Sequence, residues 1–408
     1  MDELRAAELR EALVERMIAD GRVTGEVTAA AFRAVPRHRF APAGTPLEDV
    51  YNAADAVITK RDERGAAVSS ISAPFIQARM IEQAELAPGM SVLEIGSGGY
   101  NAALLAEVVG EKGRVVSVDI DPEVVDRACA ALEATGYGDS VTVVCADAAG
   151  GVPGDEVFDR IIVTVGAPDV PPSWLAQLAA DGVIVLPLIA KGITRSVALH
   201  RRGDHLVSTS AEVCGFVPMQ GEGARPEQVV TLPDERGLHV QLRFAGEGPD
   251  DPRLLDGVLG TRRSEAWSGV TILNGVSFAD LHLWFAGFLP GFCRMAAAEG
   301  TTLAAERKGW FPFAAVPPDL GDSFAYLAIR SAPEGVEFGA RAYGPHGDEA
   351  AAAMVEQIQA WDEVARHVPS PDFAFWPVGI EPNPVQDLVS AAFPTPHGLI
   401  TISWPAAD

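Results

Sequence analysis

Residues 91–121, SVLEIGSGGYNAALLAEVVGEKGRVVSVDID, constrain the fold of this chain more than any other segment. Residues 92–95 form a short run rich in β-branched side chains, which predicts a buried strand. After a glycine-rich turn, residues 101–109 carry apolar side chains at helical spacing, and residues 114–118 form a second strand that ends at Asp119. Strand, glycine turn, helix, strand and terminal acid together make a βαβ unit of the nucleotide-binding kind.

The turn contains Gly96, Gly98 and Gly99, which allow the backbone to turn tightly and to approach a ligand closely. Asp119 lies 23 residues beyond Gly96 (119 − 96), the separation at which such an acid meets ribose hydroxyls. Ordinary tight turns also use glycine, so a purely structural turn is the alternative. Because both strands, the helix and the acid are present, we favour a nucleoside-type ligand.

The turn reads G-S-G-G, which differs from the G-x-G-x-x-G that places a helix N-terminus on a pyrophosphate. Glu94, in the strand just before the turn, would put a carboxylate beside any phosphate. An acid there suits a cationic or amine-bearing ligand better. This favours S-adenosylmethionine over NAD.

Alternation of strands and helices continues after Asp119, with a helix at 122–135, strands at 141–145, 159–165 and 183–186, and a helix from Trp174. This order predicts an α/β fold with a doubly wound, mostly parallel sheet and helices on both faces. Ligands of such sheets bind beyond the carboxyl ends of the strands. The residues expected at those ends are Gly96, Asp119, Asp147 and Thr164.

The part before this sheet is predicted to be mostly helical, with helices at 4–19, 25–34 and from Pro74 to about Leu86, and an irregular polar stretch at 51–68. Ser72 precedes the third helix, and from the sequence pattern alone a capping or turn role is the simplest interpretation. His38 lies between two arginines, a poor setting for a general base, so we expect a structural or surface role.

The second half is predicted to be a separate α+β domain. Residues 220–236, rich in Gly, Pro and charge, are expected to be a linker between a domain at 1–219 and one at 237–408. The latter is expected to have strands at 238–245, 324–331, 336–343, 372–377 and 398–404, and helices at 278–288 and 348–366. Its six tryptophans could anchor a peptide, but a core role is the more common one.

The net charge of −25 argues against unaided binding of nucleic acid, which relies on clustered Lys and Arg. No apolar run reaches membrane-spanning length and the N-terminus is charged, so we expect a cytoplasmic protein without a membrane partner. The histidines and the four cysteines show no metal-ligand spacing, so no metal is expected. The cysteines are expected to be reduced core residues, namely Cys129, Cys145, Cys214 and Cys293.

Several segments, taken in order, resemble the protein-L-isoaspartate O-methyltransferase family. They are VPRHRF (35–40), ISAP (71–74), VLEIGSGGY (92–100), CADAAGG (145–151), FDRIIVTVGAPDVP (158–171), LAQLAADGVIVLPL (175–188) and FVPM (216–219). The resemblance covers about half of the chain, residues 1–219. It implies a Rossmann-like class I methyltransferase fold and S-adenosylmethionine as the methyl donor.

The family pattern also implies roles for single residues. Gly96, Ser97 and Gly98 would contact the methionyl part of the donor, Asp119 its ribose and Asp147 its adenine amine. We expect the donor site to include, in addition, Glu94, Gly99, Ile120, Ala148 and Thr164. Ser72 matches the active-site serine, and we expect the substrate site to comprise Ile71, Ser72, Ala73 and Val165.

Three departures from the family pattern bear on the substrate. The glycine turn is one residue shorter than the usual E-I-G-(S/T)-G-S-G-Y, and the segment before Ile71 is longer and more charged than usual. In addition, residues 220–408 have no counterpart in the repair enzyme. The arrangement looks like the longer two-domain relatives associated with lanthipeptide biosynthesis.

Three functions therefore stay open. The first is methylation of an aspartate in a ribosomally made, modified peptide, with the ester closing to succinimide and then giving isoaspartate. The alternative is repair of L-isoaspartyl residues in damaged proteins. The third is a non-catalytic peptide-binding protein. The first two require a peptide or protein partner that carries aspartate or isoaspartate, and the sequence does not set the oligomeric state.

Overall fold

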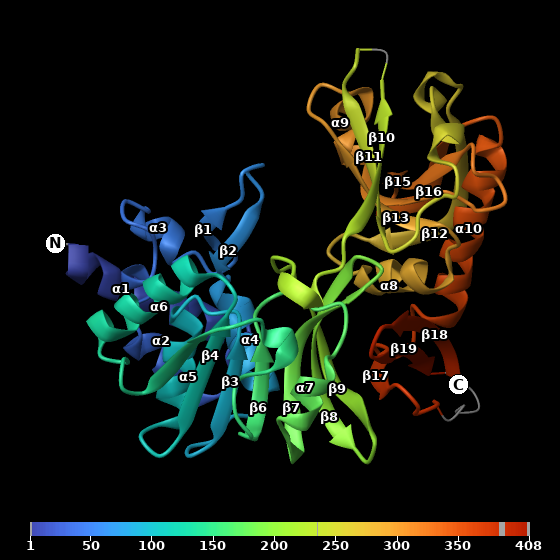
Figure 1. Ribbon diagram of the computed structural model, residues 1–408. Helices are drawn as coiled ribbons and strands as arrows, with labels where there is room; N and C mark the ends of the chain where they lie inside the picture. Colours follow the sequence, from blue (N-terminus) through green and yellow to red (C-terminus); the bar gives the residue numbers. More distant parts are fainter. Residues whose placement is uncertain (1, 235, 383–387, 406–408) are drawn as a thin grey trace.

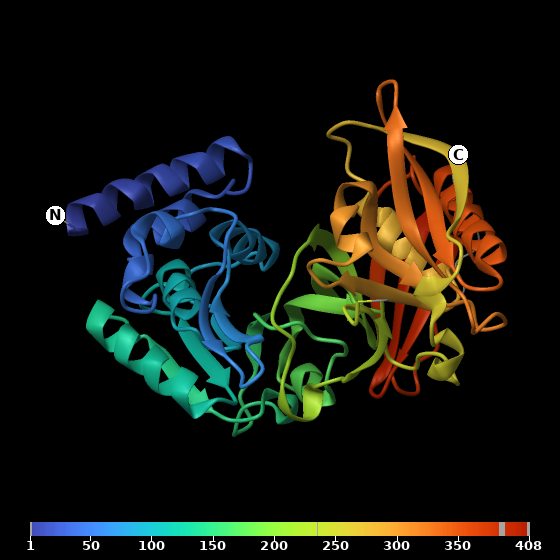
Figure 2. The ribbon, with the colours of Figure 1, turned by 90° about the horizontal axis from the view of Figure 1, so that it is seen from above.

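The computed structural model describes residues 2–234, 236–382 and 388–405. Two bodies lie side by side, with the N-terminus and the C-terminus at opposite ends of the molecule (Figures 1 and 2). One sheet of ten strands runs through both, in the order β18-β19-β17-β9-β8-β7-β6-β3-β4-β5, and a second sheet of seven strands belongs to the C-terminal body. The α/β class with an additional C-terminal sheet domain is confirmed.

Half of the ten-stranded sheet is parallel. The parallel strands are β3 (Ser91–Ile95), β4 (Arg114–Asp119), β5 (Val141–Cys145), β6 (Phe158–Val163) and β7 (Leu178–Ala190). The antiparallel strands are β8 (Ile193–Arg202), β9 (His205–Val213), β17 (Asp372–Pro377), β18 (Leu388–Thr395) and β19 (Gly398–Pro405). The expectation of a mostly parallel sheet is therefore corrected to a mixed sheet.

The helices of the first half gather mainly on one face of this sheet. They are α1 (Asp2–Ala19), α2 (Glu26–Ala34), α3 (Leu47–Val50), α4 (Pro74–Gln83), α5 (Tyr100–Val109) and α6 (Pro122–Thr135). Leu13, Phe32, Ile76 and Leu104, from four of these helices, share one core cluster with sheet residues such as Val185.

The opposite face of the sheet is not covered by a layer of long helices, as was expected for a doubly wound sheet. The segment between β5 and β6 forms only the short turn η2 (Ala148–Gly150), and α7 (Pro172–Ala176) has five residues. Side chains of the C-terminal body fill the remaining space, because Leu93 and Leu186 of the sheet belong to the same core cluster as Leu281 and Trp404. The two bodies therefore share one hydrophobic core.

The C-terminal body is built on an antiparallel sheet in the order β10-β11-β13-β14-β15-β16-β12. Its strands are β10 (Glu227–Pro233), β11 (His239–Ala245), β12 (Ser264–Leu273), β13 (Phe292–Ala297), β14 (Trp310–Ala315), β15 (Phe324–Ala332) and β16 (Gly335–Tyr343). Its helices are α8 (Ala279–Phe288), α9 (Thr302–Ala305) and α10 (Gly347–Val364), of which α10 packs on β12, β15 and β16.

Several sequence expectations fail in this part of the chain. The predicted linker 220–236 contains β10, and strands 372–377 and 398–404 join the first sheet through β9 instead of staying in the second. The polar stretch 51–68 is also not irregular throughout, because it holds β1 (Val57–Arg61) and the start of β2 (Ala67–Ile71), which pair as a hairpin.

The exposure of single side chains tests the predicted core positions of the tryptophans and cysteines. Four tryptophans of the second half, Trp284, Trp310, Trp361 and Trp404, are buried, which confirms the core role for these four. Among the cysteines Cys293 is buried, but Cys129 and Cys145 are exposed, so the prediction of core positions is wrong for these two. None of the helices formed by the described residues has the length and apolar character needed to cross a bilayer.

Trp404 gives a test of the shared core, because it is fully buried and contacts Trp284 edge-on with ring centroids 5.4 Å apart. Trp404→Ala should lower the free energy of unfolding by about 3–5 kcal/mol, the usual cost of removing a large buried aromatic side chain. Chemical denaturation followed by circular dichroism measures this. Val378→Ala, at a side chain 75% exposed, is the control and should change stability by no more than about 0.5 kcal/mol. Equal stabilities for the two variants would contradict the shared core.

Candidate functional site

The site follows from the order of the parallel strands. The chain moves from β3 to β4 and β5 on one side of the sheet, and then returns to place β6 on the other side of β3. Loops leaving β3 and β6 therefore diverge, and a crevice opens between them at the carboxyl edge of the sheet. Gly96, Asp119, Asp147 and Thr164 all follow strands at this edge, as expected from the sequence.

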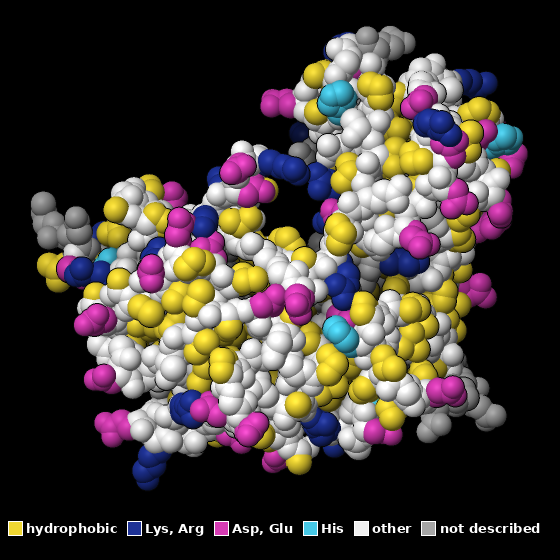
Figure 3. Space-filling view, in the orientation of Figure 1, with side chains coloured by type: hydrophobic (Ala, Val, Ile, Leu, Met, Phe, Trp, Pro, Cys, Tyr) yellow, Lys and Arg dark blue, Asp and Glu magenta, His cyan; other side chains and the backbone are white. Residues whose placement is uncertain are grey.

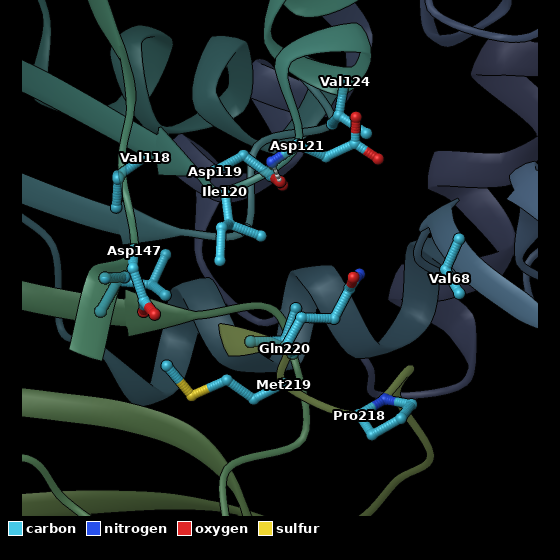
Figure 4. A pocket seen from close by; sticks show the side chains of 14 residues that line it. Val68, Val118, Asp119, Ile120, Asp121, Val124, Asp147, Pro218, Met219 and Gln220 are labelled. Carbon is cyan, nitrogen blue, oxygen red and sulfur yellow. Dashed lines mark hydrogen bonds between the residues drawn. The ribbon is translucent and has the colours of Figure 1, made fainter. Parts of the chain in front are cut away.

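A cavity lies in this crevice, and its space, open solvent included, is about 460 Å³ (Figure 4). Asp119 and Ile120 border it on one side, Asp147 and Met219 on another, and Val68 of β2 faces them across the opening. The full lining is Val68, Ile95, Gly96, Val118, Asp119, Ile120, Asp121, Val124, Asp147, Ala148, Val165, Pro218, Met219 and Gln220. The walls are thus mostly apolar, and the charged groups in them are three carboxylates.

Gly96 must be glycine for two reasons. Its φ of 95° is disfavoured for residues with a side chain, and an added Cβ would lie 2.6 Å from Oγ1 of Thr164. Thr164 Oγ1 instead donates a hydrogen bond to the Gly96 carbonyl oxygen at 2.7 Å. The turn after β3 is therefore fixed by the loop after β6.

Ser97 is the next residue of this turn. Its backbone N–H donates to Oδ2 of Asp119 at 2.9 Å, whereas its hydroxyl is fully buried and has no hydrogen-bond partner among the described residues. A buried hydroxyl without a partner costs free energy. It is accordingly a group that a ligand in this turn could satisfy.

The two acids after β4 and β5 each accept backbone hydrogen bonds on both carboxylate oxygens. Each oxygen of Asp119 accepts one backbone N–H, from Ser97 and from Asp121, and burial raises the pKa of Asp119 above its usual value. Asp147 accepts from Ala149 N at 2.9 Å and from Glu222 N at 2.8 Å. The segment after Met219 therefore folds onto Asp147 and closes that end of the cavity.

Glu94 lies away from the cavity lining. It is fully buried, and its carboxylate accepts hydrogen bonds from Asn101 Nδ2 at 2.9 Å and from the hydroxyl of Ser117. Burial raises the pKa of Glu94 to about 7. In this structure the side chain is part of the sheet interior rather than the wall of the cavity.

Ser72 follows β2 directly and is 8% exposed. Its backbone carbonyl accepts a hydrogen bond of 2.8 Å from the guanidinium of Arg37, which also donates to the carbonyl of Val50 at 2.8 Å and to Oε1 of Gln77 at 2.9 Å. Arg37 is itself fully buried, with its guanidinium 4.9 Å from the centre of the Tyr100 ring. The main chain at Ser72 is thus held by a guanidinium that water does not reach.

Arg37 begins a continuous polar network under the site. Gln77 donates to Oδ1 of Asn101 at 3.4 Å, and Asn101 in turn donates to Glu94. The network therefore joins the segment that carries Ser72 to the strand that leads into the glycine turn.

The structure brings together most of the residues predicted for the donor site. Those that line the cavity are Gly96, Asp119, Ile120, Asp147, Ala148 and Val165, the last of which was predicted for the substrate site. Ser97, Gly98, Gly99 and Thr164 belong to the adjoining loops. Ile71 ends β2, and Ser72 and Ala73 connect it to α4; all three are buried.

Sequence reasoning missed the side of the cavity formed by Val68, Pro218, Met219 and Gln220, and it missed Arg37. FVPM (216–219) and VPRHRF (35–40) stood among the matching segments, but nothing in their spacing gives them a role. The structure shows how FVPM (216–219) reaches the cavity: the N–H of Gly166 donates to Val217 O at 2.8 Å, and the carbonyl of Gly166 accepts from Met219 N at 3.0 Å. Among the described residues no cluster of side chains could hold a metal ion.

Comparison with known proteins gives a consistent family. The family model described as protein-L-isoaspartate(D-aspartate) O-methyltransferase matches residues 8–224. The protein-L-isoaspartate O-methyltransferase of Methanopyrus kandleri is 39% identical over 215 residues, which cover 52% of this chain and 92% of that protein. The enzyme of the same name from Hyperthermus butylicus is 36% identical over 238 residues, covering 54% and 92%.

Among solved structures, one of a protein-L-isoaspartate O-methyltransferase aligns with 82% of this chain and 87% of its own, with 23% identity and a TM-score of 0.49. Another, a putative protein-L-isoaspartate O-methyltransferase from Plasmodium falciparum in complex with S-adenosyl-L-homocysteine, covers 52% of this chain and 98% of its own. Its identity is 15% and its TM-score 0.45.

The raised pKa of Glu94 gives a test of the network. The pKa of Glu94 rises from its ordinary value of 4.5 to about 7 on folding, so between these pH values the folded state binds more protons at Glu94 than the unfolded chain does. This contribution to stability is fully present below pH 4.5 and is lost as the pH rises through about 7, a difference of about 3 kcal/mol.

Glu94→Gln should remove this pH dependence, because the amide keeps the size of the side chain and cannot ionise. The measurement is the free energy of unfolding at several pH values between 5 and about 8 for both proteins, without ligand. Identical pH profiles for the two proteins would show that Glu94 has an ordinary pKa.

Proposed function

We propose that this chain, which belongs to the protein-L-isoaspartate(D-aspartate) O-methyltransferase family, methylates the carboxylate of isoaspartyl residues in a polypeptide. Membership follows from the family model, which matches residues 8–224 of 408. The chain is accordingly an enzyme, a methyltransferase that uses S-adenosylmethionine, and the interpretation as a non-catalytic binding protein is set aside. The observation that supports the proposal is a single cavity lined by Gly96 of the glycine turn, by Asp119 and by Val68 of β2, the strand that leads to Ser72.

The residues of the cavity fit this donor chemically. Its apolar walls suit the flat adenine ring and the thioether carbons, and its carboxylates suit a ligand with a sulfonium and an amine. Asp119 keeps lone pairs for ribose hydroxyls after accepting one backbone N–H on each oxygen. The hydroxyl of Ser97 provides a further polar group without an internal partner.

When bound, S-adenosylmethionine supplies an electrophilic methyl group. The acceptor carboxylate is ionised at neutral pH, so the protein does not need a strong base. Its task is to align the two reactants and to exclude water. We assign to the Ser72 hydroxyl the role of orienting the acceptor by hydrogen bonding, and this role is supported by the way in which Arg37 holds the main chain of Ser72 through its carbonyl.

The ester product explains a repair outcome without further catalytic groups. The backbone nitrogen that follows the ester attacks its carbonyl carbon, methanol leaves with the proton of that nitrogen, and a succinimide forms. Water then opens the ring to aspartate or isoaspartate.

The relatives named above favour the isoaspartyl substrate over the aspartate of a modified peptide. The curated relatives from Methanopyrus and Hyperthermus carry the name of the isoaspartyl enzyme and match the first half of this chain. The assignment to lanthipeptide biosynthesis, our first expectation from the sequence, thus has no support beyond the presence of a second domain.

Methyl transfer to short peptides tests the proposal. A peptide with isoaspartate should accept label from methyl-labelled S-adenosylmethionine, and the same peptide with aspartate should accept little, because only the isomer presents the expected carboxylate geometry. Equal labelling of the two peptides, or labelling of the aspartyl peptide alone, would contradict the isoaspartyl assignment.

Ser72→Ala should lower kcat about tenfold to a hundredfold, the usual effect of losing one positioning hydrogen bond. Affinity for the donor, measured by calorimetry, should stay unchanged. Ser69→Ala is a suitable control, since the Ser69 hydroxyl contacts Thr59 and Arg127 instead of the site. Unchanged turnover in Ser72→Ala would return Ser72 to a structural role at the start of α4.

A further inference from the structure

A groove separates the donor site from the C-terminal sheet, and its space, open solvent included, is about 2120 Å³. Pro218 and Met219 line both this groove and the donor cavity. The groove is therefore continuous with the site at which methyl transfer is proposed. Figure 3 shows the molecule hollowed between its two bodies, with Lys and Arg side chains around the hollow.

The charge of the groove is opposite to that of the whole chain. The chain has 31 basic and 56 acidic residues, yet the groove is lined by four basic and two acidic ones. These are Lys191, Arg225, Arg243, Arg294, Glu227 and Glu247. Such a concentration of positive charge in an acidic protein attracts an anionic ligand.

The internal ion pairs leave this positive charge incompletely balanced. Arg243 and Arg294 share a single partner, Glu227, with Arg243 at 3.5 Å. Lys191 forms no ion pair with any residue that the structure describes, and it sits with a φ of 43° in the turn between β7 and β8. Two charges on the groove wall therefore lack an acid of their own.

Arg294 also crosses from one body to the other. An added Cβ on Gly192 would lie 2.9 Å from Nε of Arg294, so the glycine provides room for the guanidinium. That Nε is buried and has no hydrogen-bond partner among the described residues. The groove is accordingly a built feature of the contact between the two bodies, with a donor left for a ligand.

The strands around the groove favour an extended ligand. β10 is an edge strand of the seven-stranded sheet, so one side of its backbone is not paired within that sheet, and Glu227 and Val229 of this strand line the groove. Edge strands bind extended peptides through main-chain hydrogen bonds. Val229 is 42% exposed and offers an apolar contact as well.

We infer that the groove binds an extended, acidic segment of the polypeptide substrate, next to the residue that is methylated. The inference rests on the proposed function for the nature of the substrate, but binding itself requires no turnover. A polypeptide is favoured over a nucleic acid because two glutamates lie among the basic residues and because the groove adjoins the cavity proposed for the methyl donor.

Fluorescence anisotropy with labelled peptides tests the inference. One peptide carries isoaspartate followed by alternating Glu and Gly, a second has Gln in place of Glu, and an oligonucleotide of the same charge is the third probe. The acidic peptide should bind most tightly, and added salt should weaken it. Equal binding of the acidic and neutral peptides, or tighter binding of the oligonucleotide, would overturn the inference.

A charge variant locates the binding site. Lys191→Glu combined with Arg243→Gln should weaken binding of the acidic peptide about tenfold or more, as expected for the loss of close charge pairs. Lys112→Glu combined with Arg16→Gln makes the same change in charge on exposed residues outside the groove, and should alter binding by less than about twofold. Equal affinities of the two double variants would contradict the site. If the first variant does not fold, Lys191→Glu alone, at an exposed turn residue, decides the question in the same way.

Activity separates this inference from the proposed function. Methyl transfer to a short neutral isoaspartyl peptide should be retained in the groove variant, since that peptide does not reach the arginines. If the wild-type protein methylates none of the peptides but still binds the acidic one, the proposed reaction is contradicted and the inference about the groove is supported. Normal methylation without preference for the acidic peptide would contradict the groove alone.

Discussion

The parallel arrangement of β3, β4, β5 and β6 is the constraint on which the site depends. Parallel strands end at one edge of a sheet, so the loops that follow them meet there whatever their sequences. The reversal of strand order between β3 and β6 then opens the crevice. Only after this does side-chain identity matter, with glycine at position 96 and acids at 119 and 147. The antiparallel strands of this sheet all lie beyond β7, on the side away from β3.

The buried guanidinium of Arg37 has a comparable role beneath the site. Burying a charge is costly unless hydrogen bonds compensate it, and here carbonyl groups and an amide supply them in place of a carboxylate. The arrangement makes Arg37, which follows the N-terminal helices α1 and α2, part of the scaffold that holds the main chain at Ser72. Through Gln77 and Asn101 it also connects the segment of Ser72 to the protonation state of Glu94.

The sequence predicted what local patterns determine. The βαβ unit at 91–121 was clear because helical and strand periodicities alternate there, and the strand ends at Asp119 and Asp147 followed. β10 was missed because its sequence contains Pro and charged residues, which are uncommon in strands. Its buried face consists only of Val230 and Leu232, so the apolar alternation is short. The role of Arg37 could not be predicted, since its acceptors, at positions 50, 72 and 77, become neighbours only through the fold.

The pairing of β17 with β9 carries a consequence for biosynthesis. Ser208 and Phe373, joined by a hydrogen bond of 2.8 Å, lie 165 residues apart in the chain. A first half that folds as it leaves the ribosome thus presents β9 as an open edge until residues 372–377 have been made. Open edges are templates for aggregation. The nascent protein must therefore keep this edge apart from other chains during translation of some 160 residues.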